Sequence, residues 1–305
     1  MKFIRPPRLQ AGDRVRVVAA SGPVNRERFE AGVRILGERY ELTYDEDTLF
    51  ARSGFLAGED AHRLQSLNAA IADPECQAII LARGGYGLTR ILPGIDRISL
   101  RTHPKPIVGY SDVTALLSAC AHAGVASIHG PMVSDYAGLS AGDQRSLFNL
   151  LENPDPGMLL EGLKMLVEGR AQGPLLGGNL EVLTRLFGTP LQPHFQDAIL
   201  ILEEIGELPY RVDRLLTHLE LARVFDQVAG IVIGDFTDCD EIKDGQIQSP
   251  TTHEVLVERL GRLKVPVAFN GGFGHGDRKA SLPYGVRVEL DTNSGLLTAI
   301  EGAVS

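Results

Sequence analysis

Short apolar runs alternate with helical patterns through the first half of the chain. Phe29, Val33 and Leu36 have the i, i+4, i+7 spacing of one helix face. Continuous apolar strands separated by helices predict a parallel sheet that is covered on both faces. The expected strands are 14–20, 78–82 and 106–108, and the expected helices are 26–36, 59–72 and 113–122.

The pattern loosens between about residues 139 and 172, where Asn153-Pro154-Asp155-Pro156-Gly157 interrupts regular structure. We therefore expect an N-terminal α/β domain over 1–150, a linker over 151–172 and a smaller C-terminal α/β domain over 173–305. In the C-terminal part, the expected strands are 198–202, 230–233 and 286–290, and the expected helices are 179–187, 211–221 and 253–263.

Composition is typical of a globular protein, with 44% hydrophobic and 23% charged residues among 305. The formal charge of −9 argues against nucleic acid as a partner, because phosphate neutralisation needs a basic surface. No apolar stretch reaches the roughly 18 residues of a membrane span, and Arg and Pro interrupt the N-terminal segment where a secretory signal would be apolar. The odd count of separated cysteines (Cys76, Cys120, Cys239) is typical of free thiols, so we expect a cytoplasmic protein.

Ser111 follows a predicted strand and precedes a predicted helix, with Gly109 two positions earlier. A sharp strand-to-helix turn exposes such a side chain, and the helix start offers N–H groups to an oxyanion. Val113 stands where a G-x-S-x-G motif has its second glycine. The alternative is that Ser111 only caps the next helix.

Arg83-Gly84-Gly85-Tyr86-Gly87 ends another predicted strand. Its glycines permit positive φ and a close backbone approach to a ligand, so the loop is suited to an oxyanion or a phosphate. It lacks the Lys-Ser/Thr of a P-loop and the spacing of a dinucleotide site, which disfavours a nucleotide. A tight turn without a ligand is the alternative.

A nucleophilic serine needs a base, and the base needs a carboxylate to orient it. Among eight histidines, His275 lies in the glycine-rich run 271–276, which presents an imidazole from a closely bent loop. Glu203, Glu204 and Glu207 follow the strand 198–202. Because side chains alternate along a strand, only one of Glu203 and Glu204 can meet the histidine, and Glu203 is nearer the strand end.

These pieces together resemble the LD-carboxypeptidase family of serine peptidases, which is related to the microcin C self-immunity peptidases. Eight segments occur in the family's order, across nearly the whole chain. They are Ala19–Pro23, Arg83–Gly87, Gly109–Asp112, Gly130–Met132, Gly177–Leu180, Leu200–Leu219, Gly274–His275 and Leu282–Gly285.

The resemblance implies a flavodoxin-like N-terminal domain, a smaller C-terminal domain and a site at their interface. It implies Ser111 as nucleophile, His275 as base and Glu203 as the orienting acid, with Glu204 as the one-residue alternative. Backbone N–H groups of Gly84, Gly85 and Asp112 would form the oxyanion hole. A homodimer without metal or other cofactor is implied.

The implied reaction removes the terminal D-Ala of a murein tetrapeptide by cutting the L,D bond after diaminopimelate. We expect Arg83, Tyr110 and Asn179 at the substrate, and Arg278 is a second candidate for its carboxylate because guanidinium binds carboxylates bidentately. The acidic run 235–244 lacks the spacing of a calcium loop and is expected to be a solvated loop.

Two other functions remain open from the sequence. A microcin-type peptidase would cut an acyl-sulfamoyl adenylate, and the absence of Trp disfavours a site that stacks on adenine. A non-catalytic module would use the glycine turns to hold a small anion.

Overall fold

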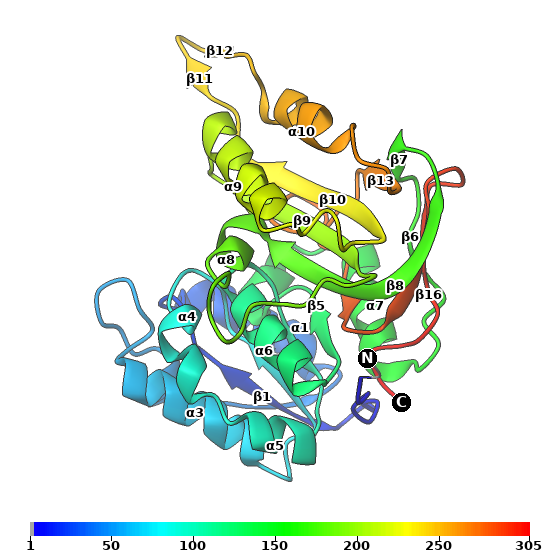
Figure 1. The fold of residues 1–305 in the computed structure, drawn as a ribbon. Coiled ribbons are helices and arrows are strands. Elements are labelled where there is room, and N and C mark those ends of the chain that lie inside the picture. The colour runs from blue at the N-terminus through cyan, green and yellow to red at the C-terminus, as the bar shows by residue number, and fades with distance from the viewer. Residues whose placement is uncertain (1–2) are drawn as a thin grey trace. The chain divides into compact units, whose positions relative to one another are not determined.

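The computed structural model describes residues 3–305, which divide into two compact units (Figure 1). The first unit holds residues up to 156 together with 281–286 and 301–305, and the second holds 157–280 and 287–300. The expected linker, 151–172, instead carries two complete strands and the start of a third. The fold is an α/β protein with a parallel-sheet N-terminal part and a mixed-sheet C-terminal part, as predicted.

The sheet of the first unit has the strand order β14-β5-β4-β3-β1-β2. Strands β1 to β5 are parallel in the order of flavodoxin-like folds, and β14 adds an antiparallel edge strand beside β5. In such sheets, ligands bind beyond the carboxyl ends of the strands. The strands are β1 (Arg14–Val18), β2 (Glu41–Thr43), β3 (Ala78–Leu81), β4 (Ile107–Gly109), β5 (Ser127–His129) and β14 (Leu282–Tyr284).

Helices cover both faces of this sheet. Figure 1 shows α3, α5 and α6 on the near side of β1 and α1 on the far side. Helix α1 buries Phe29, Gly32 and Leu36, whereas Val33 of the predicted set is only half-buried. The buried face includes Gly32 because the carbonyl of Val133 lies where a Cβ of residue 32 would be. The helices are α1 (Arg26–Gly37), α2 (Glu46–Leu49), α3 (Asp60–Ala72), α4 (Leu88–Ile91), α5 (Arg97–Thr102), α6 (Thr114–Ala123), α7 (Ala141–Glu152) and the 3₁₀ helices η1 (Leu92–Gly94), η2 (Ser111–Val113) and η3 (Val133–Gly138).

The second unit is built on a mixed sheet with the order β6-β16-β15-β8-β9-β10-β13-β7. Strands β8, β9, β10 and β13 are parallel, and antiparallel strands flank them. The elements are β6 (Met158–Leu160), β7 (Lys164–Val167), β8 (Arg170–Asn179), β9 (Ile199–Ile205), β10 (Gly230–Thr237), β13 (Val267–Phe269), β15 (Arg287–Asp291), β16 (Leu296–Ala299), the hairpin β11 (Ile242–Lys243) and β12 (Gln246–Ile247), and helices α8 (Leu180–Thr184), α9 (Pro209–Leu221) and α10 (Thr252–Leu260).

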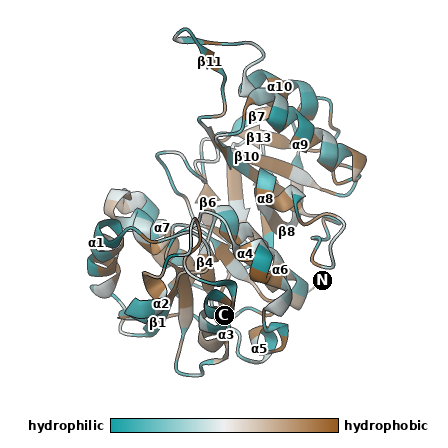
Figure 2. Ribbon diagram, turned by 90° about the vertical axis from the view of Figure 1, so that its left-hand side faces the viewer, coloured by the Kyte–Doolittle hydropathy of each residue, from teal (hydrophilic) through white to brown (hydrophobic). Residues whose placement is uncertain are grey.

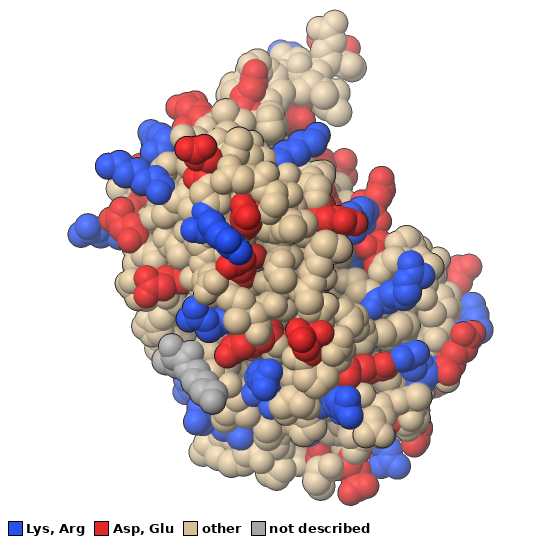
Figure 3. Space-filling view, turned by 90° about the vertical axis from the view of Figure 1, so that its right-hand side faces the viewer, with Lys and Arg blue, Asp and Glu red and all other residues tan. Residues whose placement is uncertain are grey.

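Hydropathy follows the burial of these elements. The central strands, such as Ala78–Leu81, are buried along their whole length because helices cover both faces. In Figure 2 the strand β4 is brown and the outer side of α1 is teal. Among residues 3–305, no helix combines the length and apolar character needed to cross a bilayer. Acidic and basic side chains are interspersed on the face shown in Figure 3.

Candidate active site

Ser111 lies at a sharp turn between β4 and α6 in the first unit. Its φ is +63°, an uncommon value for a residue with a side chain and one that is concentrated at functional sites. A side chain at Gly109 would overlap Val113, so the turn requires glycine there. Ser111 is the N-cap of neither η2 nor α6, and neither helix start has a side-chain cap. The helix-cap alternative for Ser111 therefore has no support in the structure.

The glycine loop after β3 lies directly against Ser111. A Cβ added to Gly84 would lie 3.0 Å from both Cβ and Oγ of Ser111. Gly85 has φ of +117° and packs on Gly22, and the N–H of Gly22 donates to the Gly84 carbonyl at 3.1 Å. Within residues 3–305, Gly84 and Gly85 donate no hydrogen bond to another backbone group. Their N–H groups are therefore suited to an incoming anion.

Asp112 connects the serine turn to the glycine loop. Its Oδ2 accepts a hydrogen bond from the Leu88 N–H at 2.9 Å, which links η2 to the start of α4. Burial raises the pKa of the Asp112 carboxyl. This bond holds the two strand ends together, so the Asp112 side chain has a structural role. The role predicted for Asp112 as an oxyanion donor belongs to its backbone N–H, which is not part of this bond.

The contact between Gly84 and Ser111 gives a direct test. In Gly84→Ala, the added methyl should displace the Ser111 hydroxyl or the loop, because 3.0 Å is too close for two carbon atoms. We expect labelling of Ser111 by a fluorophosphonate to slow by roughly 100- to 1000-fold, the scale of losing one oxyanion donor. Gly138→Ala is the control, because a Cβ there meets open space. Equal labelling rates in both variants would contradict the assignment of this loop.

Glu203 and His275 meet in the second unit. His275 Nδ1 lies 2.7 Å from Glu203 Oε2, and the two side chains are 15% and 0% exposed. With Nδ1–H donating to the carboxylate, Nε2 is the basic nitrogen of the imidazole. The sequence-predicted acid and base are therefore hydrogen-bonded to each other.

Glycine at position 274 makes this contact possible. Gly274 has φ of +104°, and a Cβ there would lie 2.5 Å from Glu203 Oε2. The glycine-rich run thus allows the backbone to pass beside the buried carboxylate. The bend expected from the sequence around His275 is present.

Glu204 points away from this pair, as strand alternation predicts. Its carboxylate accepts hydrogen bonds from Asn179 Nδ2 at 2.9 Å, the Glu181 N–H at 2.7 Å and its neighbour Ile205 N–H at 2.9 Å. These contacts fix the start of α8. Of the two neighbouring acids, only Glu203 contacts His275 in the second unit.

Burial also makes Glu204 sensitive to pH. Desolvation raises its pKa from 4.5 to about 7, despite the three hydrogen bonds. The folded protein therefore binds this proton more tightly than the unfolded chain, and the free energy of unfolding should fall as pH rises from about 4.5 to 7. The expected loss is up to about 3 kcal/mol. Urea unfolding at pH 5 and pH 7.5 should show a smaller decrease in Glu204→Gln; an identical decrease in both proteins would contradict this origin.

The three residues expected at the substrate have structural partners. Arg83 Nη1 donates to the Pro23 carbonyl at 2.9 Å, and the hydroxyl of buried Tyr110 donates to Asp135 at 3.3 Å. Asn179 caps α8 through Oδ1 and donates to Glu204. Arg83 is exposed beside the glycine loop, so of the three its side chain is the most accessible. Substrate contacts by these residues stay predictions.

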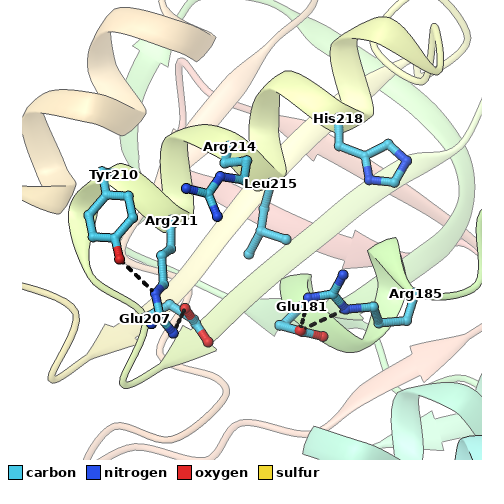
Figure 4. Close-up of a pocket in the computed structure, with 8 residues that line it drawn as sticks. All are labelled: Glu181, Arg185, Glu207, Tyr210, Arg211, Arg214, Leu215 and His218. Carbon is cyan, nitrogen blue, oxygen red and sulfur yellow. Dashed lines mark hydrogen bonds and ion pairs between the residues drawn. The ribbon is translucent and has the colours of Figure 1, made fainter.

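A groove of about 290 Å³ lies between α8 and α9 (Figure 4). Arg185 pairs with Glu181, and Arg211 with Glu207 at 3.4 Å, so two of its three guanidinium groups are already neutralised. Neither Glu203 nor His275 lines it. This groove is therefore separate from the candidate acid–base pair.

One acidic residue near the pair is not predicted from the sequence. The sequence predicts a solvated loop from Asp235 onward, but β10 continues to Thr237 and half-buries Asp235 beside the loop of His275. The sequence predicts a strand that ends at Ile233, because polar residues follow it. Within residues 3–305, no cluster of three or more His, Cys, Asp or Glu side chains is arranged to hold a metal.

Comparison with known proteins identifies the family of the chain. Family models of the LD-carboxypeptidase N-terminal and C-terminal domains match residues 15–130 and 172–290. The murein tetrapeptide carboxypeptidase of Pseudomonas aeruginosa is 33% identical, over 92% of this chain and 94% of that protein. The microcin C7 self-immunity protein of Escherichia coli is 26% identical, over 97% of this chain and 96% of that protein.

A solved structure has the same fold. The muramoyltetrapeptide carboxypeptidase from Oxalobacter formigenes superimposes with a TM-score of 0.83 at 28% identity, covering 95% of this chain and 98% of that one. The similarity therefore extends across both units and their connecting segments.

Proposed function

Since this chain belongs to the LD-carboxypeptidase family, we propose that it is a serine peptidase that removes the terminal D-Ala from murein tetrapeptide. The bond cut is the L,D peptide bond between diaminopimelate and D-Ala. The observation that carries the proposal is the 2.7 Å hydrogen bond between His275 Nδ1 and the fully buried Glu203 carboxylate. A buried carboxylate that fixes the tautomer of an imidazole is the second half of a catalytic triad.

In the proposed reaction, Ser111 Oγ attacks the carbonyl carbon of the scissile bond while His275 Nε2 accepts the hydroxyl proton. Glu203 holds the imidazole in the required tautomer and stabilises the imidazolium that forms. The negative charge on the tetrahedral oxygen is stabilised by N–H groups of Gly84, Gly85 and Asp112. The φ of +63° at Ser111 supports its role, because the turn presents the hydroxyl beside these donors.

The second half of the reaction returns the enzyme to its starting state. His275 gives its proton to the departing D-Ala amine, and the acyl group stays on Ser111 as an ester. Water, deprotonated by His275, then attacks this ester and releases the tripeptide. Arg83 is our candidate for the substrate's terminal carboxylate, because it is exposed beside the glycine loop. The proposal includes a homodimer, which sedimentation analysis would test.

Product analysis tests the substrate. Purified protein is incubated with murein tetrapeptide, and mass spectrometry follows tripeptide and free D-Ala. A parallel incubation contains an aminoacyl-sulfamoyl adenosine, the substrate class of the microcin-type alternative. We expect tripeptide from the first and little hydrolysis in the second. The reverse result would exchange the ranking of the two substrates, and no hydrolysis in either would overturn the peptidase proposal.

A further inference from the structure

The loop of His275 contacts two carboxylates that belong to neighbouring strands. Gly274, on one side of the histidine, packs against Glu203 of β9. Gly276, on the other side, packs against the carboxylate of Asp235 on β10, so closely that a Cβ would overlap Oδ2. The Asp235 N–H also donates to the Phe273 carbonyl at 3.0 Å. The two glycines therefore allow the loop of His275 to pack against both Glu203 and Asp235.

A β-bulge places Asp235 there. Leu202 pairs with Ile233, and Glu204 pairs with Phe236, so two steps along β9 correspond to three steps along β10. Gly234 and Asp235 together lie opposite Glu203. Bulges reorient side chains and occur next to active sites. A side chain at Gly234 would overlap Phe273, so this glycine makes room for the His275 loop.

Asp235 has little to gain structurally from its charge. Its Oδ2 is inaccessible and has no hydrogen-bond partner among residues 3–305, and the same is true of Glu203 Oε1. The nearby charges are Glu203 on β9 and Asp277, Arg278 and Lys279 on the loop. Lys279 Nζ donates to the carbonyls of Gly274 and Gly276, at 3.2 and 3.3 Å. Removing a carboxylate oxygen from water without a hydrogen-bond partner lowers stability, which suggests that Asp235 serves another purpose.

We propose that Asp235 is a positioning residue that acts through the Glu203–His275 pair, and that its negative charge makes the imidazole more basic. This inference rests on the proposed function. Formation of the imidazolium in the transition state is favoured by each nearby negative charge. Glu203 contributes through a direct hydrogen bond, and Asp235 contributes from the neighbouring strand.

Stability and activity should respond oppositely to loss of this charge. Burial, and then repulsion from Glu203, raise the pKa of Asp235. A carboxyl whose pKa is raised by folding binds its proton more tightly in the folded state, so its ionised form opposes folding at neutral pH. Asp235→Asn should therefore unfold at the same temperature as the wild type or higher, whereas a merely structural role would lower that temperature.

The experiment is a nitrogen-detected NMR titration of His275 in the wild type, Asp235→Asn and Asp235→Ser. We expect the imidazolium pKa to fall by about 0.5 to 1 pH unit in both variants, since a nearby negative charge favours the protonated form. Asp277→Asn is the matched control: it removes the same charge from an exposed position on the same loop, and solvent screening should keep its shift much smaller.

Tripeptide release gives the second readout. With murein tetrapeptide, kcat of Asp235→Asn should fall roughly tenfold at pH 8, with the acidic limb of the kcat/KM profile moved to lower pH and KM nearly unchanged. An unchanged His275 pKa, or an equal shift in Asp277→Asn, would overturn the inference. The titration needs no substrate. Failure of the wild type to release tripeptide would therefore refute the proposed function separately.

Discussion

Replacing Ser111 by alanine should abolish peptidase turnover, with kcat reduced by roughly four to six orders of magnitude, the range seen when a triad nucleophile is removed. The reason is that the substitution removes the hydroxyl that lies against Gly84. The fold should persist, because the Ser111 side chain caps neither following helix. The measurement is tripeptide release together with labelling by a fluorophosphonate and mapping of the labelled peptide.

Ser118→Ala is the matched control for that substitution. Ser118 lies in the helix that follows Ser111, is fully buried and donates to the Thr114 carbonyl at 2.9 Å. Its loss should cost about 1 kcal/mol of stability and leave kcat within a few-fold of wild type. Two results together would favour the non-catalytic binding module. The wild-type protein would not be labelled at all, and small anions would bind equally well to the wild type and to Ser111→Ala.

Glu203→Gln should lower kcat by roughly 10³- to 10⁴-fold, the effect of losing a triad carboxylate. The substitution keeps the volume of the side chain. However, an amide accepts a hydrogen bond from His275 Nδ1–H only through its oxygen, and it has no negative charge with which to stabilise an imidazolium. The affinity for substrate should change far less than kcat. Tripeptide release at saturating substrate is the measurement, with the NMR signals of His275 reporting its tautomer.

The neighbouring residue supplies the comparison. Glu204→Gln removes an acidic group one position along the same strand, but its side chain faces the start of α8. We expect kcat to change less than tenfold on general packing grounds. Similar losses in both variants would mean that charge in this strand, rather than the bond to His275, explains the effect.

The sequence identifies the elements whose pattern is continuous. Ala78–Leu81 is a buried apolar run, and the structure has β3 at these residues. Alternation along β9 is enough to separate Glu203 from Glu204, because it depends only on strand geometry. For this reason the acid–base pair can be predicted from the sequence.

Other elements have no such local signal. The strand β8 contains Gly173, Gly177 and Gly178, and glycine weakens strand propensity. Those glycines are required by neighbours distant in sequence, since a Cβ at Gly177 would overlap the Ile201 carbonyl. The bulge that half-buries Asp235 likewise depends on pairing with another strand. Both features are tertiary, and they explain why the expected linker and solvated loop are parts of the second sheet.

The strand β14 comes from residues 282–284 but completes the sheet that begins at β1. The backbone thus passes from one unit to the other after residues 156, 280, 286 and 300. A fragment ending at 156 would leave the hydrogen-bonding groups of β5 without their neighbour. Such an unpaired edge strand promotes aggregation. The two halves are interwoven in the chain, and a gene for either one alone would not encode an intact module.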